Sequence, residues 1–100
     1  QSGEAVAELR RILLLSPDHI EARNNLAVIE LSAGDAEAAL EHFNLTLEQE
    51  PNNAKALYYK GGILLQSGEI ETARHLIKQT IATNNTDYQP KAEELLKALP

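Results

Sequence analysis

The feature that most limits what this chain can fold into is an internal repeat of 34 residues. Shifting the chain against itself aligns residues 17–50 (PDHIEARNNLAVIELSAGDAEAALEHFNLTLEQE) with residues 51–84 (PNNAKALYYKGGILLQSGEIETARHLIKQTIATN). Eight aligned pairs are identical: Pro17/Pro51, Ala22/Ala56, Ile29/Ile63, Leu31/Leu65, Gly34/Gly68, Glu37/Glu71, Ala39/Ala73 and Thr46/Thr80. A fixed period of this length predicts a stack of similar units, in which each unit packs on its neighbours.

Each unit contains the signals of two helices. The shared Gly supplies the positive φ that ends a helix, and the shared Pro suits a first helical turn. Asp35 and Glu69 follow the glycines and place negative charge where the next helix dipole favours it. The chain has only four aromatic residues and no period-2 alternation, which argues against strands. We therefore predict an all-α fold with helices at 18–32, 35–49, 52–66 and 69–83.

The flanking segments extend the same register. In residues 3–15 (GEAVAELRRILLL), Ala5 and Leu9 align with Ala39 and Phe43, which makes this segment the second helix of a truncated unit. Pro90 begins PKAEELLKAL, a short helix with charged residues on its outer side. A stacked array needs a closing helix with one polar face, and this segment has that composition.

The helix–turn–helix period of 34 residues, with AxxxF and a following Pro, resembles the tetratricopeptide repeat (TPR) family. The resemblance implies a right-handed α-solenoid with a C-terminal capping helix. The single domain, 1–100, would comprise a truncated repeat at 1–16, repeats at 17–50 and 51–84, and a cap at 85–100. Arg23 and Leu57 stand where the family often has a large aromatic residue, and Asn85 stands where a third Pro is expected. These departures suggest a looser stack.

Composition excludes several functions. The formal net charge of −6 argues against nucleic acid or an anionic membrane surface as a partner. Without cysteine there is no disulfide, thiolate nucleophile or Cys-based zinc site. The longest apolar run, ILLL at 12–15, is far shorter than the roughly 20 residues of a membrane span, so we expect no direct membrane insertion. The compartment stays unknown, and the cytoplasm is slightly favoured over the periplasm.

Enzyme signals are weak. The three histidines, His19, His42 and His75, lack the HExxH spacing that sets two imidazoles on one helical face, and we expect them to be solvent-exposed. The many carboxylates follow helix-surface spacing, and no pattern builds a pocket that would separate the pKa values of two of them. We expect no catalytic residue, no metal and no cofactor.

The TPR resemblance also implies a ligand groove lined by the first helix of each repeat. The residues at the family's contact positions are Glu21, Asn24, Asn25, Val28 and Leu31 in one repeat, and Lys55, Tyr58, Tyr59, Gly62 and Leu65 in the next. Residues 21, 24, 25, 28 and 31 form one stripe on a helix, which independently supports the choice. Packing against a neighbouring helix is the alternative role for the tyrosines.

Some family members hold a peptide carboxylate at these positions. Asn25 and Lys55 match two places of that clamp, but Tyr59 stands where Arg would be. A carboxylate clamp is therefore at most half present.

Three functions follow. The first is a non-catalytic protein–protein interaction or scaffolding module that binds a peptide or helix of a partner in the concave groove. The second is a regulatory or targeting segment of a larger enzyme, because the chain starts in mid-repeat without Met and reads as part of a longer protein. The third is homo-oligomerisation through the N-terminal helix, where Leu9, Ile12 and Leu13 would be exposed.

Overall fold

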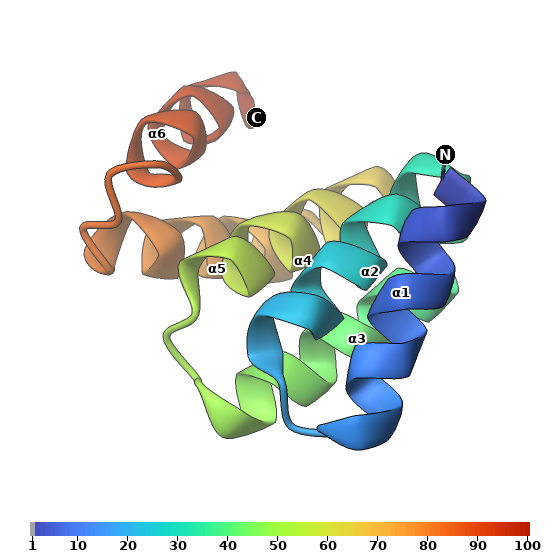
Figure 1. The fold of residues 1–100 in the computed structure, drawn as a ribbon. Helices are drawn as coiled ribbons and strands as arrows, with labels where there is room; N and C mark the ends of the chain where they lie inside the picture. Colours follow the sequence, from blue (N-terminus) through green and yellow to red (C-terminus); the bar gives the residue numbers. More distant parts are fainter. Residues whose placement is uncertain (1) are drawn as a thin grey trace.

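A computed structural model describes residues 2–100, and in this range the chain has six helices and no strand (Figure 1). The helices are α1 (Ser2–Leu15), α2 (Ile20–Ser32), α3 (Ala36–Gln49), α4 (Ala54–Gln66), α5 (Ile70–Ala82) and α6 (Gln89–Ala98). Each helix packs mainly on its neighbours in sequence, from α1 at one end of the molecule to α6 at the other. The chain is therefore an all-α solenoid, as the repeat predicts.

The four helices α2 to α5 begin one or two residues later than predicted, and side chains cap the N-termini of α2, α3 and α4. His19 Nδ1 accepts from the Ala22 N–H at 3.1 Å, and Asn53 Oδ1 accepts from the Ala56 N–H at 3.0 Å. Pro17 and Pro51 lie in the turns before α2 and α4, outside the helices, as the predicted boundaries place them.

The glycine turns are confirmed. Gly34 has a φ of 92° and Gly68 a φ of 89°, values that only glycine adopts without strain. Their N–H groups donate to the carbonyls of Leu31 and Leu65 at 3.0 and 3.1 Å, which closes the ends of α2 and α4. Asp35 then caps α3 by accepting from the Ala38 N–H at 3.1 Å.

The core lies between the helix pairs in two clusters. The first contains Ala27, Ala39, Phe43, Ala56 and Ile63, and the second contains Leu57, Leu64, Ala73 and Leu76. Small residues allow the helices to approach closely: a Cβ added to Gly61 would lie 3.1 Å from Ile77 Cγ1. Gly61 is therefore needed where α4 crosses α5.

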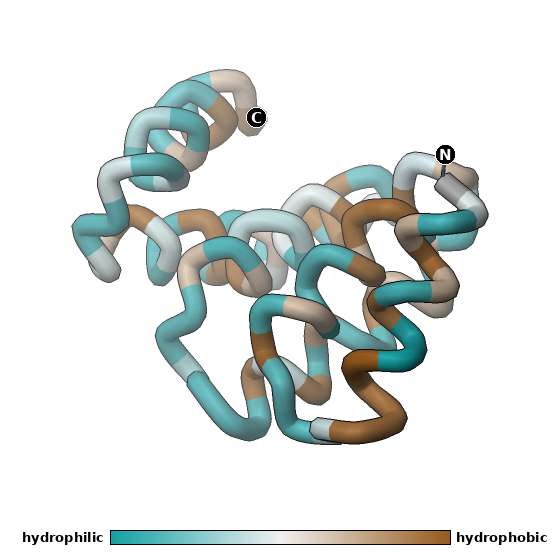
Figure 2. Tube along the Cα trace, viewed as in Figure 1, coloured by the Kyte–Doolittle hydropathy of each residue, from teal (hydrophilic) through white to brown (hydrophobic). Residues whose placement is uncertain are grey.

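The prediction for the N-terminal helix was wrong in detail. Leu9, Ile12 and Leu13 are half-buried, because α1 packs on α2. The exposed residues are Leu14 and Leu15, with 81% and 79% of their surface accessible. Figure 2 shows this apolar C-terminal part of α1 at the edge of the molecule.

The prediction that all three histidines are solvent-exposed was also wrong for His42. Its imidazole is half-buried, with Nδ1 3.1 Å from Arg23 Nη1 and Nε2 3.5 Å from Glu30 Oε1. The 34-residue register aligns Arg23, Glu30 and His42 with Leu57, Leu64 and Leu76, three residues of the second core cluster. The first repeat thus has a polar cluster where the second has leucines.

Candidate functional site

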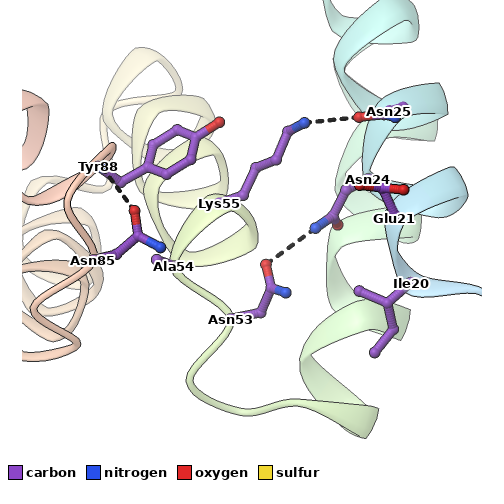
Figure 3. Close-up of a pocket in the computed structure, with 9 residues that line it drawn as sticks. All are labelled: Ile20, Glu21, Asn24, Asn25, Asn53, Ala54, Lys55, Asn85 and Tyr88. Carbon is purple, nitrogen blue, oxygen red and sulfur yellow. Dashed lines mark hydrogen bonds between the residues drawn. The ribbon is translucent and has the colours of Figure 1, made fainter.

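Eight of the ten predicted groove residues line one of two cavities beside α2 and α4. The first cavity, about 270 Å³, is polar and lies where α2, α4 and the turn before α6 come together (Figure 3). Its lining residues are Ile20, Glu21, Asn24, Asn25, Asn53, Ala54, Lys55, Asn85 and Tyr88. Glu21, Asn24, Asn25 and Lys55 are thereby brought together as the sequence predicts.

A hydrogen bond between Asn25 and Lys55 joins the two inner helices across this cavity. Lys55 Nζ donates to Asn25 Oδ1 at 2.8 Å, and both side chains are half-buried (Figure 3). Within residues 2–100, neither side chain makes another hydrogen bond. The amide hydrogens of Asn25 and the remaining ammonium hydrogens of Lys55 are therefore available to a ligand. The polar cavity can therefore donate hydrogen bonds to an acceptor.

Asn24 has a different environment from its neighbour. Its side chain is 3% exposed, accepts from Thr46 Oγ1 at 2.9 Å and donates from Nδ2 to Asn53 Oδ1 at 3.0 Å. Asn53 is also the N-cap of α4. Asn24 therefore joins α2 to α3 and to the start of α4, and it forms the floor of the cavity instead of facing solvent.

The second cavity, about 310 Å³, is largely apolar. Its lining residues are Leu31, Tyr58, Tyr59, Gly62, Ile63, Gln66 and Leu95. A Cβ added to Gly62 would have no atom within 4 Å, so there is room for another group beside this glycine. Leu95 comes from α6, so the closing helix supplies one wall of this cavity.

The four aromatic residues form one chain of contacts beside the cavities. Phe43 stacks on Tyr59 with ring centroids 5.6 Å apart, Tyr59 meets Tyr58 at 5.4 Å, and Tyr58 meets Tyr88 at 5.5 Å. Tyr59 therefore packs on the buried Phe43 of the neighbouring helix α3, which is the alternative role given above for the tyrosines. The same tyrosine also lines the apolar cavity. Burial, and then the nearby Tyr59, raise the pKa of Tyr88 above its ordinary value.

Two predicted residues lie outside both cavities. Val28 packs on the first core cluster, and Leu65 packs on the second. Sequence reasoning also missed the residues contributed by turns and by α6, chiefly Asn53, Asn85, Tyr88 and Leu95. The scarcity of aromatic residues was a usable signal for Tyr88, because a rare large side chain is seldom left without packing partners.

Within residues 2–100, no group of three or more His, Asp or Glu side chains is arranged to hold a metal ion. None of the helices in this range combines the length and the apolar character that crossing a membrane requires.

Stacked helix pairs joined by glycine turns define a helical-repeat protein. Two family models described as tetratricopeptide repeat match residues 30–99 and 1–53, and the chain belongs to this family. It is also 31% identical over 86 residues to the "TPR repeat-containing protein PA0015" of Pseudomonas aeruginosa, covering 86% of this chain and 82% of that protein. Repeats of this family generally mediate protein–protein interactions.

Proposed function

We propose that the chain is a non-catalytic interaction module that binds a peptide or helical segment of a partner protein along α2 and α4. The observation that carries this proposal is the pairing of a polar and an apolar cavity beside the same two helices. The cavities are neighbours, because Tyr88 lines the first, Tyr58 lines the second, and their rings are 5.5 Å apart. One continuous ligand segment can therefore reach both.

In the polar cavity, Asn25 and Lys55 would hold the ligand by hydrogen bonds. The Asn25 amide donates to backbone carbonyls, and the Lys55 ammonium suits a carbonyl or a carboxylate. Glu21 is exposed on the rim and accepts from backbone N–H groups. These groups match the alternating donors and acceptors of a peptide backbone.

The apolar cavity would take one apolar side chain of the ligand. Its volume of about 310 Å³ is at the lower end of small-molecule pockets, which span about 300–1,000 Å³, so it suits a side chain better than a large cofactor. Leu31, Tyr58 and Leu95 supply apolar contact area, and Gly62 leaves the entrance open. Burial of that side chain would provide much of the affinity.

Peptide-array screening followed by isothermal titration calorimetry tests this proposal. For a peptide captured by the array, we expect Asn25→Ala and Lys55→Ala each to weaken binding about tenfold, the effect of losing roughly 1.4 kcal/mol of hydrogen bonding. Lys78→Ala is the matched control, because Lys78 is an exposed lysine on α5 away from both cavities. Equal affinity for all three variants and the unchanged chain would show that the ligand binds elsewhere.

A further inference from the structure

Hydrogen bonds within the chain already occupy the side-chain oxygens of the four asparagines that line the polar cavity (Figure 3). Each oxygen accepts at 2.8–3.0 Å, and the bonds are Thr46 Oγ1 to Asn24, Lys55 Nζ to Asn25, Asn24 Nδ2 to Asn53, and the N–H groups of Asp87 and Tyr88 to Asn85. In the described part of the chain, the amide hydrogens of Asn25 and Asn85 have no acceptor. The cavity therefore offers a ligand mainly hydrogen-bond donors.

A neutral acceptor suits these donors better than an anion does. Lys55 and Glu21 line the same cavity, so their opposite charges offset each other there. The formal net charge of −6 also disfavours an anionic partner. Backbone carbonyls are neutral acceptors, but in a helix all except the last four already accept from the helix itself. An extended polyproline II segment has no internal hydrogen bond, so all its carbonyls are available.

The aromatic residues of the groove favour proline in such an extended segment. All three tyrosines of the chain line the cavities: Tyr58 and Tyr59 line the apolar one, and Tyr88 lines the polar one. Their ring centroids are 5.4–6.1 Å apart, so the rings form one aromatic surface between the cavities. Proline-rich segments dock on aromatic-lined grooves, because the polyproline II helix is already formed before binding. Proline also has no N–H that a cavity of donors would leave unpaired.

We propose that the ligand of this groove is a proline-rich segment in the polyproline II conformation. Its carbonyls would accept from Asn25, Lys55 and Asn85, and its pyrrolidine rings would pack on the tyrosines. Glu21 is exposed, so it keeps its hydration when the ligand offers it no N–H. Gly62 leaves room for a ring in the apolar cavity. This inference rests on the groove function proposed above and narrows it to one class of peptide.

Tyrosine fluorescence reports on this ligand directly, because the chain has no tryptophan and all its tyrosines line the cavities. The probe is an oligoproline of about nine residues, roughly 28 Å long, acetylated and amidated so that it carries no charge. We expect a saturable change in fluorescence with a dissociation constant below about 1 mM. The comparison peptides are a capped Gly-Ser peptide, a capped alanine-rich helical peptide, and a Gly-Ser peptide with a free C-terminal carboxylate. Each should bind at least about tenfold more weakly.

Two substitutions of asparagine by aspartate test the donors. Asn25→Asp and Asn85→Asp keep an oxygen for the internal hydrogen bonds and remove the amide hydrogens, so both variants should fold. We expect each to weaken oligoproline binding about tenfold. Asn52→Asp is the control, because Asn52 is an exposed asparagine that lines neither cavity, and it should bind as the unchanged chain does.

Tyr58→Leu tests the aromatic surface. It keeps an apolar side chain and removes the flat ring, and we expect it to weaken oligoproline binding about tenfold. Unchanged oligoproline binding in Tyr58→Leu or in both aspartate variants would overturn the inference, and so would equal binding of any comparison peptide.

The array-captured peptide separates failure of this inference from failure of the groove function. If oligoproline does not bind at millimolar concentration, but Lys55→Ala weakens binding of the captured peptide, the proline assignment is wrong and the groove function stands. If neither Asn25→Ala nor Lys55→Ala weakens binding of the captured peptide, the groove function is wrong, and the proline assignment fails with it.

Discussion

Asn24 and Asn25 are neighbours in sequence, but their side chains have different structural roles. The Asn24 amide is buried and bridges Thr46 of α3 and Asn53 at the start of α4. The Asn25 side chain is half-buried, faces the polar cavity and accepts one hydrogen bond from Lys55. A mediocre helix former is tolerated at both positions, because each amide has a tertiary partner that compensates for its low helix propensity.

The two asparagines should therefore differ in their effect on stability. Asn24→Ala leaves the hydroxyl of Thr46, a fully buried residue, without its acceptor, and we expect the free energy of unfolding to fall by about 1–3 kcal/mol. Asn25→Ala should cost less than about 1 kcal/mol, because Lys55 can turn to water. Urea denaturation followed by circular dichroism measures both. A larger loss in Asn25→Ala would contradict the assigned roles.

Gly61 and Gly62 form a second contrasting pair of neighbours. A Cβ at Gly62 meets nothing within 4 Å, so Gly62→Ala should stabilise α4 by about 0.5–1 kcal/mol through helix propensity. The same methyl group would narrow the entrance of the apolar cavity and weaken ligand binding. A Cβ at Gly61 would lie 3.1 Å from the fully buried Ile77, and overpacking should outweigh the propensity gain.

Thermal denaturation of the two glycine variants separates these effects. We expect the melting temperature of Gly62→Ala to rise and that of Gly61→Ala to fall. A stabilised Gly61→Ala would mean that Ile77 can move aside, and that the crossing of α4 and α5 is less tightly packed than the distances indicate.

At the scale of elements, the two repeats stabilise the packing of their helices by different chemistry. The second repeat packs Leu57, Leu64 and Leu76 between its helices, whereas the first has the cluster of Arg23, Glu30 and His42 at the equivalent positions. Arg23 also donates to the carbonyl of Pro17 and so holds the turn before α2. A half-buried polar cluster contributes less stability than leucines of similar volume, because its charges lose hydration.

Replacing the whole cluster should therefore differ from breaking it. We expect the triple variant Arg23→Leu, Glu30→Leu, His42→Leu to be as stable as the natural chain or more stable, since it copies the second repeat. Arg23→Leu alone should destabilise by about 1–3 kcal/mol, because the partly shielded His42 and the carbonyl of Pro17 lose their hydrogen-bond partner. Urea denaturation measures both, and a single variant more stable than the triple would contradict this explanation.

Much of the fold follows from the sequence, because the repeat and its glycines are local signals. The N-terminal boundaries were less accurate, since whether Asp18 and His19 lie inside or before α2 depends on which side chain caps the helix. The burial of Asn24 and His42 depends on partners more than 15 residues away in sequence, and helical periodicity does not reveal these partners. The position of Leu95 beside α4 likewise depends on how α6 packs.

At the scale of the whole molecule, a stack of helices has two ends and one inner face, and each has its own chemistry. α1 lies at one end of the described chain (Figure 1), and α6 at the other end contributes Leu95 to the apolar cavity. The inner helices α2 and α4 carry the polar and apolar cavities side by side.

The most direct test of the groove is a nuclear magnetic resonance titration of the isotope-labelled chain with a captured peptide. We expect the largest changes in amide chemical shift at Asn25, Lys55, Tyr58 and Gly62, with smaller changes near Leu95. The amides of α1 and the outer side of α5 should stay unchanged. Shifts concentrated on α1, α3 or α5, with α2 and α4 unaffected, would contradict the proposal that α2 and α4 form the binding site.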